Sequence, residues 1–258
     1  MKEVITRKEK IVIAVLIAAA VIGLAVLGIV YRDSLGAALA KNFPSDYASL
    51  LGTGLRNTFL ITLAAFALGL VFGTLVCLVT QSASQNVFVL ILKEIARFYV
   101  LLFRGTPVVV QLLIIYFIVF ASYSGDSLYV AMVAFGLNSG AYVSEILRGG
   151  ILAVPQGQRE AGLSLGLSYR SVMEKIILPQ AFKNAFPALG NELVTLLKET
   201  SVAGFIGTLD LTLAFRKIAN ATYDFVTVYL VMGLLYFIIV LLLSELLKLI
   251  ERKAFAHA

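Results

Sequence analysis

Residues 160–179, EAGLSLGLSYRSVMEKIILP, form a polar segment between two long apolar stretches. Gly166 can adopt the positive φ that ends a helix, and Ser168 is a favourable N-cap for a second helix that begins near Tyr169. Pro179 is expected to stop this second helix, because proline has no N–H to donate and its ring clashes with the preceding turn. The segment therefore predicts two short helices joined by a bend. The second helix has an apolar stripe that consists of Val172, Met173, Ile176 and Ile177.

A compact helical loop with one apolar face is suited to docking in the groove of another protein. The alternative is an amphipathic loop that lies on lipid headgroups. A helix on the membrane surface needs no glycine bend at a fixed position, so the docking interpretation is favoured.

The composition places the chain in a membrane. Of its 258 residues, 60% are hydrophobic and 14% are charged, and the mean hydropathy is +0.95, which is too apolar for a soluble domain of this length. The isoelectric point near 9.4 would also suit a nucleic-acid-binding protein, but the lysines and arginines lie between long apolar runs. We therefore expect a polytopic protein that contacts the lipid bilayer and binds no nucleic acid. The single Cys77 excludes an internal disulfide.

Six apolar stretches are long enough to cross a bilayer, which takes about 20 helical residues. They predict an all-α fold with transmembrane helices at about 11–30, 57–79, 95–120, 128–147, 184–206 and 225–248. The expected parts are an N-terminal part (1–50) with the first helix and an outer linker, a core (51–250) with a cytoplasmic loop at about 148–183, and a tail (251–258).

An even number of spans puts both ends of the chain on one side of the membrane. Placing them in the cytoplasm assigns fourteen lysines and arginines to that side and five to the other, as the positive-inside rule requires. The first apolar run, 11–30, follows basic residues and resembles a cleaved signal peptide in that respect. It is longer than the usual apolar region of about 7–15 residues, so a retained helix is expected.

The quoted segment resembles the cytoplasmic coupling loop of permeases in ATP-binding-cassette importers. The pattern of that family is E-A-A, three residues, Gly, nine residues and I-x-L-P. In this chain Glu160, Ala161, Gly166, Ile176, Leu178 and Pro179 match it, and Gly162 replaces the second Ala. Further segments, FRGTPVVVQ, NSGAYVSEILRGGI, VPQGQREAG, LPQAF and ALGNELVTLLKETS, are similar to signatures of the polar amino acid uptake permeases over about residues 54–250.

This resemblance implies a type I importer permease with a five-helix core and an extra N-terminal helix, in a prokaryotic cytoplasmic (inner) membrane. It implies a second permease subunit of the same or a homologous chain, two cytoplasmic ATPase subunits that hold ATP and Mg, and an extracytoplasmic amino acid binding protein. The chain has no G-x-x-x-x-G-K-[ST] phosphate loop. It is therefore expected to be a transport subunit and not an enzyme, with no cofactor or metal of its own.

Polar residues inside the predicted spans are candidates for the substrate pathway, because charges in hydrocarbon usually face a cavity or a partner. Arg104, or a backbone N–H near the interruption at Gly105-Thr106-Pro107, suits the carboxylate of an amino acid, and Glu145 suits its ammonium. Gln111, Asn138 and Tyr142 can supply neutral hydrogen bonds. The alternative is that these charges only pair with each other. The candidate structural pairs are Arg104 with Glu145, and Glu192 with Lys198.

Other classes of membrane protein fit less well. A secondary amino acid transporter driven by an ion gradient would usually have an internal repeat, and the two halves of the chain share none. A channel would need a ring of filter residues, and an enzyme a catalytic cluster.

The GxxxG pairs Gly69–Gly73 and Gly136–Gly140 are expected to pack helices.

Overall fold

The computed structural model describes residues 41–82 and 84–255, which are helical and contain no strand. The predicted span 11–30, and with it the question of a signal peptide, lies outside the described residues. The α-helices are α3 (Ala48–Gln81), α4 (Val87–Gly105), α5 (Val108–Ile114), α6 (Ser127–Leu152), α7 (Gln156–Ser164), α8 (Tyr169–Val172), α9 (Leu178–Glu199), α10 (Leu211–Thr222) and α11 (Phe225–Phe255). Two 3-10 helices, Ser45–Tyr47 and Thr200–Ile206, and two π turns, Ile115–Val119 and Met173–Ile177, connect them.

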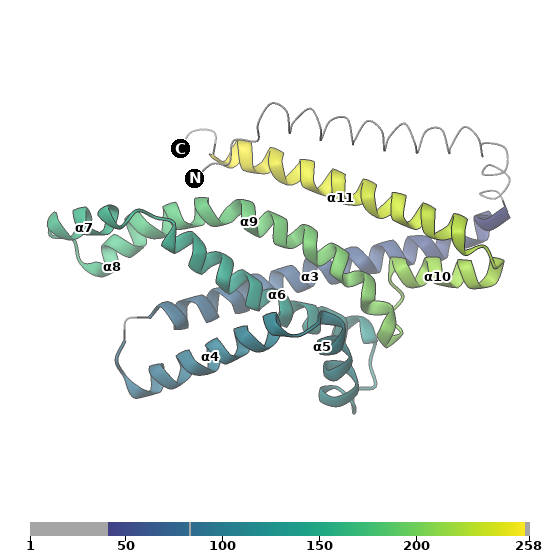
Figure 1. Cartoon of the computed structure of the whole chain (residues 1–258), viewed down its shortest axis with the longest axis horizontal. Helices are drawn as coiled ribbons and strands as arrows, with labels where there is room; N and C mark the ends of the chain where they lie inside the picture. The colour runs from purple at the N-terminus through teal and green to yellow at the C-terminus, as the bar shows by residue number, and fades with distance from the viewer. Residues whose placement is uncertain (1–40, 83, 256–258) are drawn as a thin grey trace, which may run out of the picture.

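The long helices run side by side, with α7 and α8 at one end of the molecule and α10 at the other (Figure 1). Below, these are called the loop end and the α10 end. The largest helix contact joins α3 to α6, and a cluster of buried apolar residues fills the space between α3, α5, α6 and α9. A second cluster packs α10 against α3 and α11 at the α10 end.

Three helices, α3, α6 and α11, are long and apolar enough to cross a membrane, and they contain the predicted spans 57–79, 128–147 and 225–248. The predicted span 184–206 corresponds to α9 and the 3-10 helix that follows. Helix α9 is not among the candidate spans, because polar residues such as Lys183, Asn191 and Glu192 lower its hydropathy.

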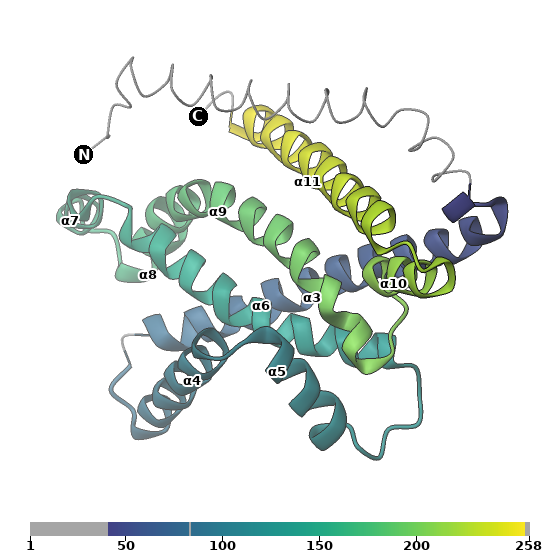
Figure 2. The same ribbon diagram turned by 45° about the vertical axis from the view of Figure 1, so that its right-hand side comes forward.

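The predicted span at 95–120 is a bent pair of helices, interrupted at Gly105-Thr106-Pro107. The helix begins at Val87, breaks after Gly105 and continues from Val108 at an angle of 114° (Figure 2). Pro107 disfavours the helical conformation of the residue before it, and Thr106 is indeed extended (φ −125°, ψ 151°). Counted as one broken span, this bent pair brings the number of candidate spans among the described residues to four.

The small residues of the GxxxG pairs lie in the α3–α6 interface, as expected. A Cβ atom on Gly73 would lie 2.6 Å from Val143 Cγ1 and 2.7 Å from the carbonyl oxygen of Gly140. In lipid, helices associate through such close packing, since apolar side chains gain nothing by leaving the hydrocarbon. Because these glycines have no side chain, α3 and α6 can approach each other closely.

Replacing Gly73 with Leu is expected to destabilise the protein by more than the 1–3 kcal/mol typical of overpacking, since a backbone oxygen must move. Gly52→Leu is the matched control in the same helix, because a Cβ there meets nothing within 4 Å. The melting temperature of the two purified variants in detergent checks this. Equal melting temperatures would contradict the packing role.

The helix α10 was not predicted from the sequence. It is amphipathic, with Phe215 and Ile218 fully buried and Arg216 and Lys217 exposed. Its N-cap is Asp210, whose Oδ1 accepts a hydrogen bond from the backbone N–H of Leu213 at 2.8 Å. The side chain of Asp210 is completely buried, and its Oδ2 has no hydrogen-bond partner among the described residues.

Burial raises the pKa of Asp210 to about 6. The folded protein therefore binds a proton between about pH 4 and 6 that the unfolded chain does not, so stability should fall as the pH rises through this window. The effect is at most about 3 kcal/mol. Asn caps helices as well as Asp does, so Asp210→Asn is expected to remove this pH dependence in melting experiments, whereas Asp210→Ala should also lose the cap.

Candidate functional site

The local structure of the 160–179 segment agrees with the prediction in its first half. Gly166 has φ +75°, and its N–H donates to the carbonyl oxygen of Leu163 at 2.9 Å, which ends α7. Ser168 caps α8 by accepting a hydrogen bond from the N–H of Ser171 at 3.2 Å. Two helices joined by a bend are therefore confirmed.

The predicted stop at Pro179 was wrong. The chain remains helical from α8 through the π turn Met173–Ile177 into α9, and Pro179 lies in the first turn of α9. Because the π turn is wider than an α-helical turn, it tolerates the loss of the hydrogen bond that proline cannot make. The side chain of Gln180 donates from Nε2 to the carbonyl oxygen of Ile176 at 2.8 Å, which satisfies one of the backbone acceptors at this point.

The apolar stripe of this helix faces the rest of the chain and is not a free docking face. Val172 and Ile177 are 0% and 2% exposed, packed with Val154 and Ala181. Gly162 allows this packing, since a Cβ there would lie 2.9 Å from Val172 Cγ2. The glycine that departs from the family pattern thus brings α7 close to α8.

The exposed apolar surface of the segment lies instead around the bend. It consists of Leu163, Leu165, Leu167 and Tyr169, which we call the bend surface; Leu165 is 80% exposed. Of the other residues that match the family pattern, Glu160, Ala161, Leu178 and Pro179 are exposed, while Ile176 is half-buried.

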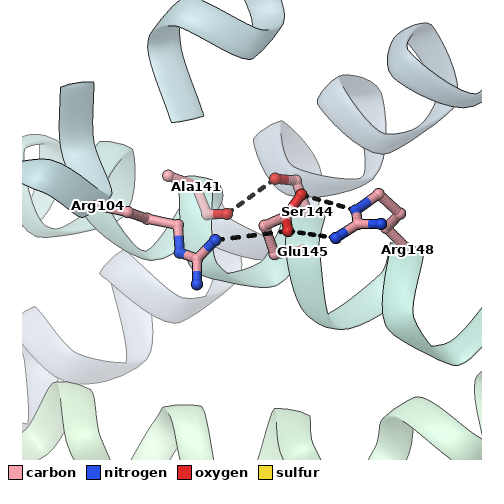
Figure 3. A network of polar contacts seen from close by, with 5 residues as sticks. All are labelled: Arg104, Ala141, Ser144, Glu145 and Arg148. Carbon is pink, nitrogen blue, oxygen red and sulfur yellow. Dashed lines mark hydrogen bonds and ion pairs between the residues drawn. The ribbon is translucent and has the colours of Figure 1, made fainter. Parts of the chain in front are cut away.

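A network of charges connects the last turn of α4 to α6 (Figure 3). Arg148 donates to Glu145 through two nitrogens, Nε to Oε1 at 2.9 Å and Nη2 to Oε2 at 2.8 Å. Arg104 approaches the same carboxylate from the other side, with Nη1 3.4 Å from Oε2, and its guanidinium lies 5.4 Å from the centre of the Tyr142 ring. The carboxylate of Glu145 thus contacts two arginines, Arg148 through two short hydrogen bonds and Arg104 through one longer contact.

Arg148 was missed as a member of this site, because it was counted only as a cytoplasmic charge. Its spacing of three residues from Glu145 on one helix was a signal that could have found it. The ion pair between Arg104 and Glu145, one of the alternatives considered above, is present.

The network lines a cavity of about 570 Å³ between α3, α4 and α6. Its charged wall comprises three guanidinium groups and one carboxylate, from Arg97, Arg104, Arg148 and Glu145. Arg97 is paired with Glu94, outside the lining. The cavity can therefore accept a group that carries both a negative and a positive charge.

Gln111 and Asn138 form a separate buried cluster at the break between α4 and α5. The side-chain Nε2 of Gln111 donates to the carbonyl oxygens of Phe103 at 2.8 Å and Thr106 at 2.9 Å, and its Oε1 accepts from Asn138 Nδ2 at 2.9 Å. Gln111 thus caps the open end of α4, which carries Arg104. Of these two predicted pathway residues, only Asn138 has a buried side-chain atom, its Oδ1, without a hydrogen-bond partner among the described residues.

Gln111→Leu is expected to lower stability by about 1–3 kcal/mol, since it removes the donor to two carbonyl groups at the end of α4 and leaves the buried Nδ2 of Asn138 without its acceptor. Gln111→Glu keeps the size but removes the amide donor, so it should be equally damaging at neutral pH. Thermal melting of both variants checks this capping role. Normal stability with impaired uptake would instead support the predicted contact with substrate.

The predicted pair of Glu192 with Lys198 is absent. Glu192 of α9 is 7% exposed and accepts a hydrogen bond from Ser139 Oγ of α6 at 2.8 Å. Lys198 lies one to two turns further along and is exposed. Within residues 41–82 and 84–255, no group of three or more His, Cys, Asp or Glu side chains is placed to hold a metal ion.

Comparisons with known proteins place this architecture in a family. Residues 73–255, more than half of the chain, match the family described as binding-protein-dependent transport system inner membrane component. The arginine transport system permease protein ArtQ of Bacillus subtilis (strain 168) is 41% identical over 78% of this chain and 90% of its own. The glutamine transport system permease protein GlnP of Escherichia coli (strain K12) is 34% identical over 79% and 92%.

Solved structures agree in fold. An amino acid ABC transporter crystallised with histidines matches with a TM-score of 0.74 and 36% identity, over 81% of this chain and 96% of that one. The MetNI methionine ABC transporter matches with a TM-score of 0.69 at 22% identity, over 82% and 99%, which shows the fold alone. The chain therefore belongs to the family of binding-protein-dependent transport system inner membrane components, as a permease subunit of an ATP-binding-cassette amino acid importer whose ATPase is a separate subunit.

Proposed function

We propose that two copies of this chain, or this chain and a homologous one, form the pathway for a polar amino acid across a prokaryotic cytoplasmic membrane. Two ATPase subunits, which hold ATP and Mg, would dock on its cytoplasmic side, and a binding protein would deliver the amino acid from outside. The relatives named for arginine, glutamine and cystine transport support a polar amino acid as the substrate.

The shared carboxylate of Glu145 is the observation that supports a substrate contact in the cavity. Arg148 holds it with two short hydrogen bonds, whereas Arg104 stands 3.4 Å away. The weaker contact between Arg104 and Glu145 can be replaced by contacts with a ligand at a lower cost in free energy. A zwitterionic amino acid would therefore insert between them, its carboxylate on Arg104 and its ammonium on Glu145, while Arg148 keeps Glu145 in place.

The bend surface is the proposed contact with the ATPase. It is apolar and exposed and lies at the loop end of the molecule, far from α10 (Figure 1). Because exposed apolar patches mark sites of interaction, Leu165 and its neighbours suit a groove in a partner. The proposed orientation is therefore that the loop and both chain termini are cytoplasmic and that α10 is outside.

Uptake into proteoliposomes tests this function. The chain, the ATPase and the binding protein are reconstituted, and uptake of arginine, glutamine and cystine is measured with ATP supplied on the ATPase side. Uptake that requires ATP supports the proposal. Uptake driven by an ion gradient without the ATPase would contradict it, and labelling of a cysteine reporter at Ser168 from outside intact cells would contradict the orientation.

A further inference from the structure

One face of α11 is uncovered in the described part of the chain. Of the three candidate spans, α11 is the least buried. Its uncovered apolar side chains include four that are 46–66% exposed and that we call the α11 stripe: Leu230, Leu234, Phe237 and Leu241. They follow each other at spacings of four, three and four residues, which puts them on one side of the helix. This is the spacing of a helix that packs along another helix.

The chain ahead of the described residues leads to the first turn of α11. Asn42 is buried, and its Nδ2 donates to Oδ2 of Asp224 at 2.7 Å. The other carboxylate oxygen of Asp224 accepts from the N–H of Thr227 at 3.0 Å, in the first turn of α11. The ring of Phe43 packs edge-on against that of Phe215, with the ring centres 5.9 Å apart. The described chain therefore starts at the α10 end, beside the beginning of α11.

This starting point puts α11 within reach of the apolar run 11–30. The ten residues 31–40 can span up to about 33 Å, whereas the axes of packed helices lie only about 8–10 Å apart. A connection of this length also keeps the run at a high effective concentration beside α11 of the same chain. The run is therefore a nearby occupant for the α11 stripe.

The run 11–30 and α11 match in apolar length. The run has 20 residues without a charge, and so has the stretch 225–244 of α11. The run ends and α11 begins toward the α10 end, so the two helices would be antiparallel, with Val30 level with Phe225. Residues whose numbers add up to 255 would then lie at the same height.

The side chains at equal heights are complementary in size. In this register the α11 stripe, taken from Leu241 back to Leu230, lies level with Ala14, Ala18, Val21 and Ala25. Small residues let two helices approach each other in a membrane, and large side chains opposite them fill the space between the helices. Both sets repeat with the same spacing of four and three residues.

We propose that residues 11–30 form a retained transmembrane helix that packs antiparallel on α11 of the same chain and covers the α11 stripe. The inner side of α11 packs on α9 and α10. The added helix would therefore hold α11 against the core from the opposite side. This packing goes beyond the proposed function and does not depend on which amino acid is carried.

The experiment introduces pairs of cysteines into the full chain, in native membranes and with the natural cysteine removed by Cys77→Ala. The two level pairs are Ala18→Cys with Phe237→Cys, and Ala25→Cys with Leu230→Cys. In the matched control, Ala20→Cys with Phe237→Cys, the first cysteine lies on the opposite side of the helix, 200° around from Ala18 at about 100° per residue. After oxidation, non-reducing gels separate disulfides within one chain from those between two chains, and mass spectrometry identifies the linked peptides.

Both level pairs should join most chains internally, because a disulfide needs Cα atoms about 4.4–6.8 Å apart, and the control pair should join few. Disulfides only between two chains would overturn the proposal in favour of a second copy on α11. No disulfide in either level pair would overturn it in favour of lipid, and equal yields in all pairs would refute the register. Mature protein without residues 11–30 would show a cleaved signal peptide and refute it as well.

Thermal melting of the full chain gives a second measurement that needs no cysteine. Ala18→Leu should lower the melting temperature in detergent by several °C, since it puts a larger side chain between the packed helices. Ala20→Leu makes the same change on the opposite side of the helix and should leave the melting temperature near that of the wild type. Equal melting temperatures of the two variants would contradict the proposed packing face.

Discussion

Glu145→Gln is expected to reduce ATP-driven uptake by about 10-fold to 100-fold, the loss that follows from removing one charge-assisted contact with the ammonium of the substrate. The substitution also leaves Arg104 and Arg148 facing each other without their shared carboxylate. Because all three side chains are 27–43% exposed, the stability cost should stay below the 3–5 kcal/mol of a fully buried pair.

Uptake and melting temperature measured on one reconstituted variant separate transport from stability. Glu94→Gln is the matched control, since it removes an equivalent carboxylate from the exposed pair with Arg97 on α4. Adding Arg104→Gln to Glu145→Gln should restore stability by removing the unpaired cation but should not restore uptake. If the double variant regained uptake, Glu145 would be a structural partner and no ligand for the substrate.

Leu165→Asp is expected to abolish capture of the ATPase, and with it uptake, because it puts a charge into the centre of the bend surface. Leu165 is 80% exposed, so the fold and the melting temperature of the permease should not change. Gln158→Asp on the exposed face of α7 is the matched control. Co-purification with the ATPase measures the effect, and normal capture by Leu165→Asp would exclude the bend surface as the docking site.

Gly166 allows a second, independent test of the same surface. Its φ of +75° strains any residue with a branched Cβ, although a Cβ there meets no atom within 4 Å. Gly166→Val should therefore distort the bend and weaken capture, whereas Gly166→Asn, which tolerates this conformation, should bind the ATPase nearly as well as the wild type.

Features set by the chemistry of single residues could be predicted from the sequence. Gly166 and Ser168 determine a helix end and a helix start over a few residues, and the glycines at 73 and 140 pack helices wherever two helices meet. The helix α10 could not be found from an apolar run of about 20 residues, because it is short and buries only one face at the α10 end.

Features set by partners distant in sequence could not be predicted. The stripe of Val172 and Ile177 has the same pattern whether it faces Val154 and Ala181 or another protein. Likewise, an intramembrane Gln111 suits a substrate as well as it suits the carbonyl groups of a broken helix. The bend at 105–108 was signalled locally by Pro107, but its angle depends on the tertiary contacts of α5.

The helical path from Tyr169 to Glu199 has a mechanical consequence. Because Pro179 does not interrupt it, some 30 residues form one continuous helical path, about 45 Å long along the chain, with Pro187 inside it. Any rigid rotation of this helical path about its axis, applied at the loop end, turns Glu192 and Lys198 through the same angle. The torque that a docked partner exerts on α8 therefore needs no chain of intervening side chains to reach the buried carboxyl group of Glu192.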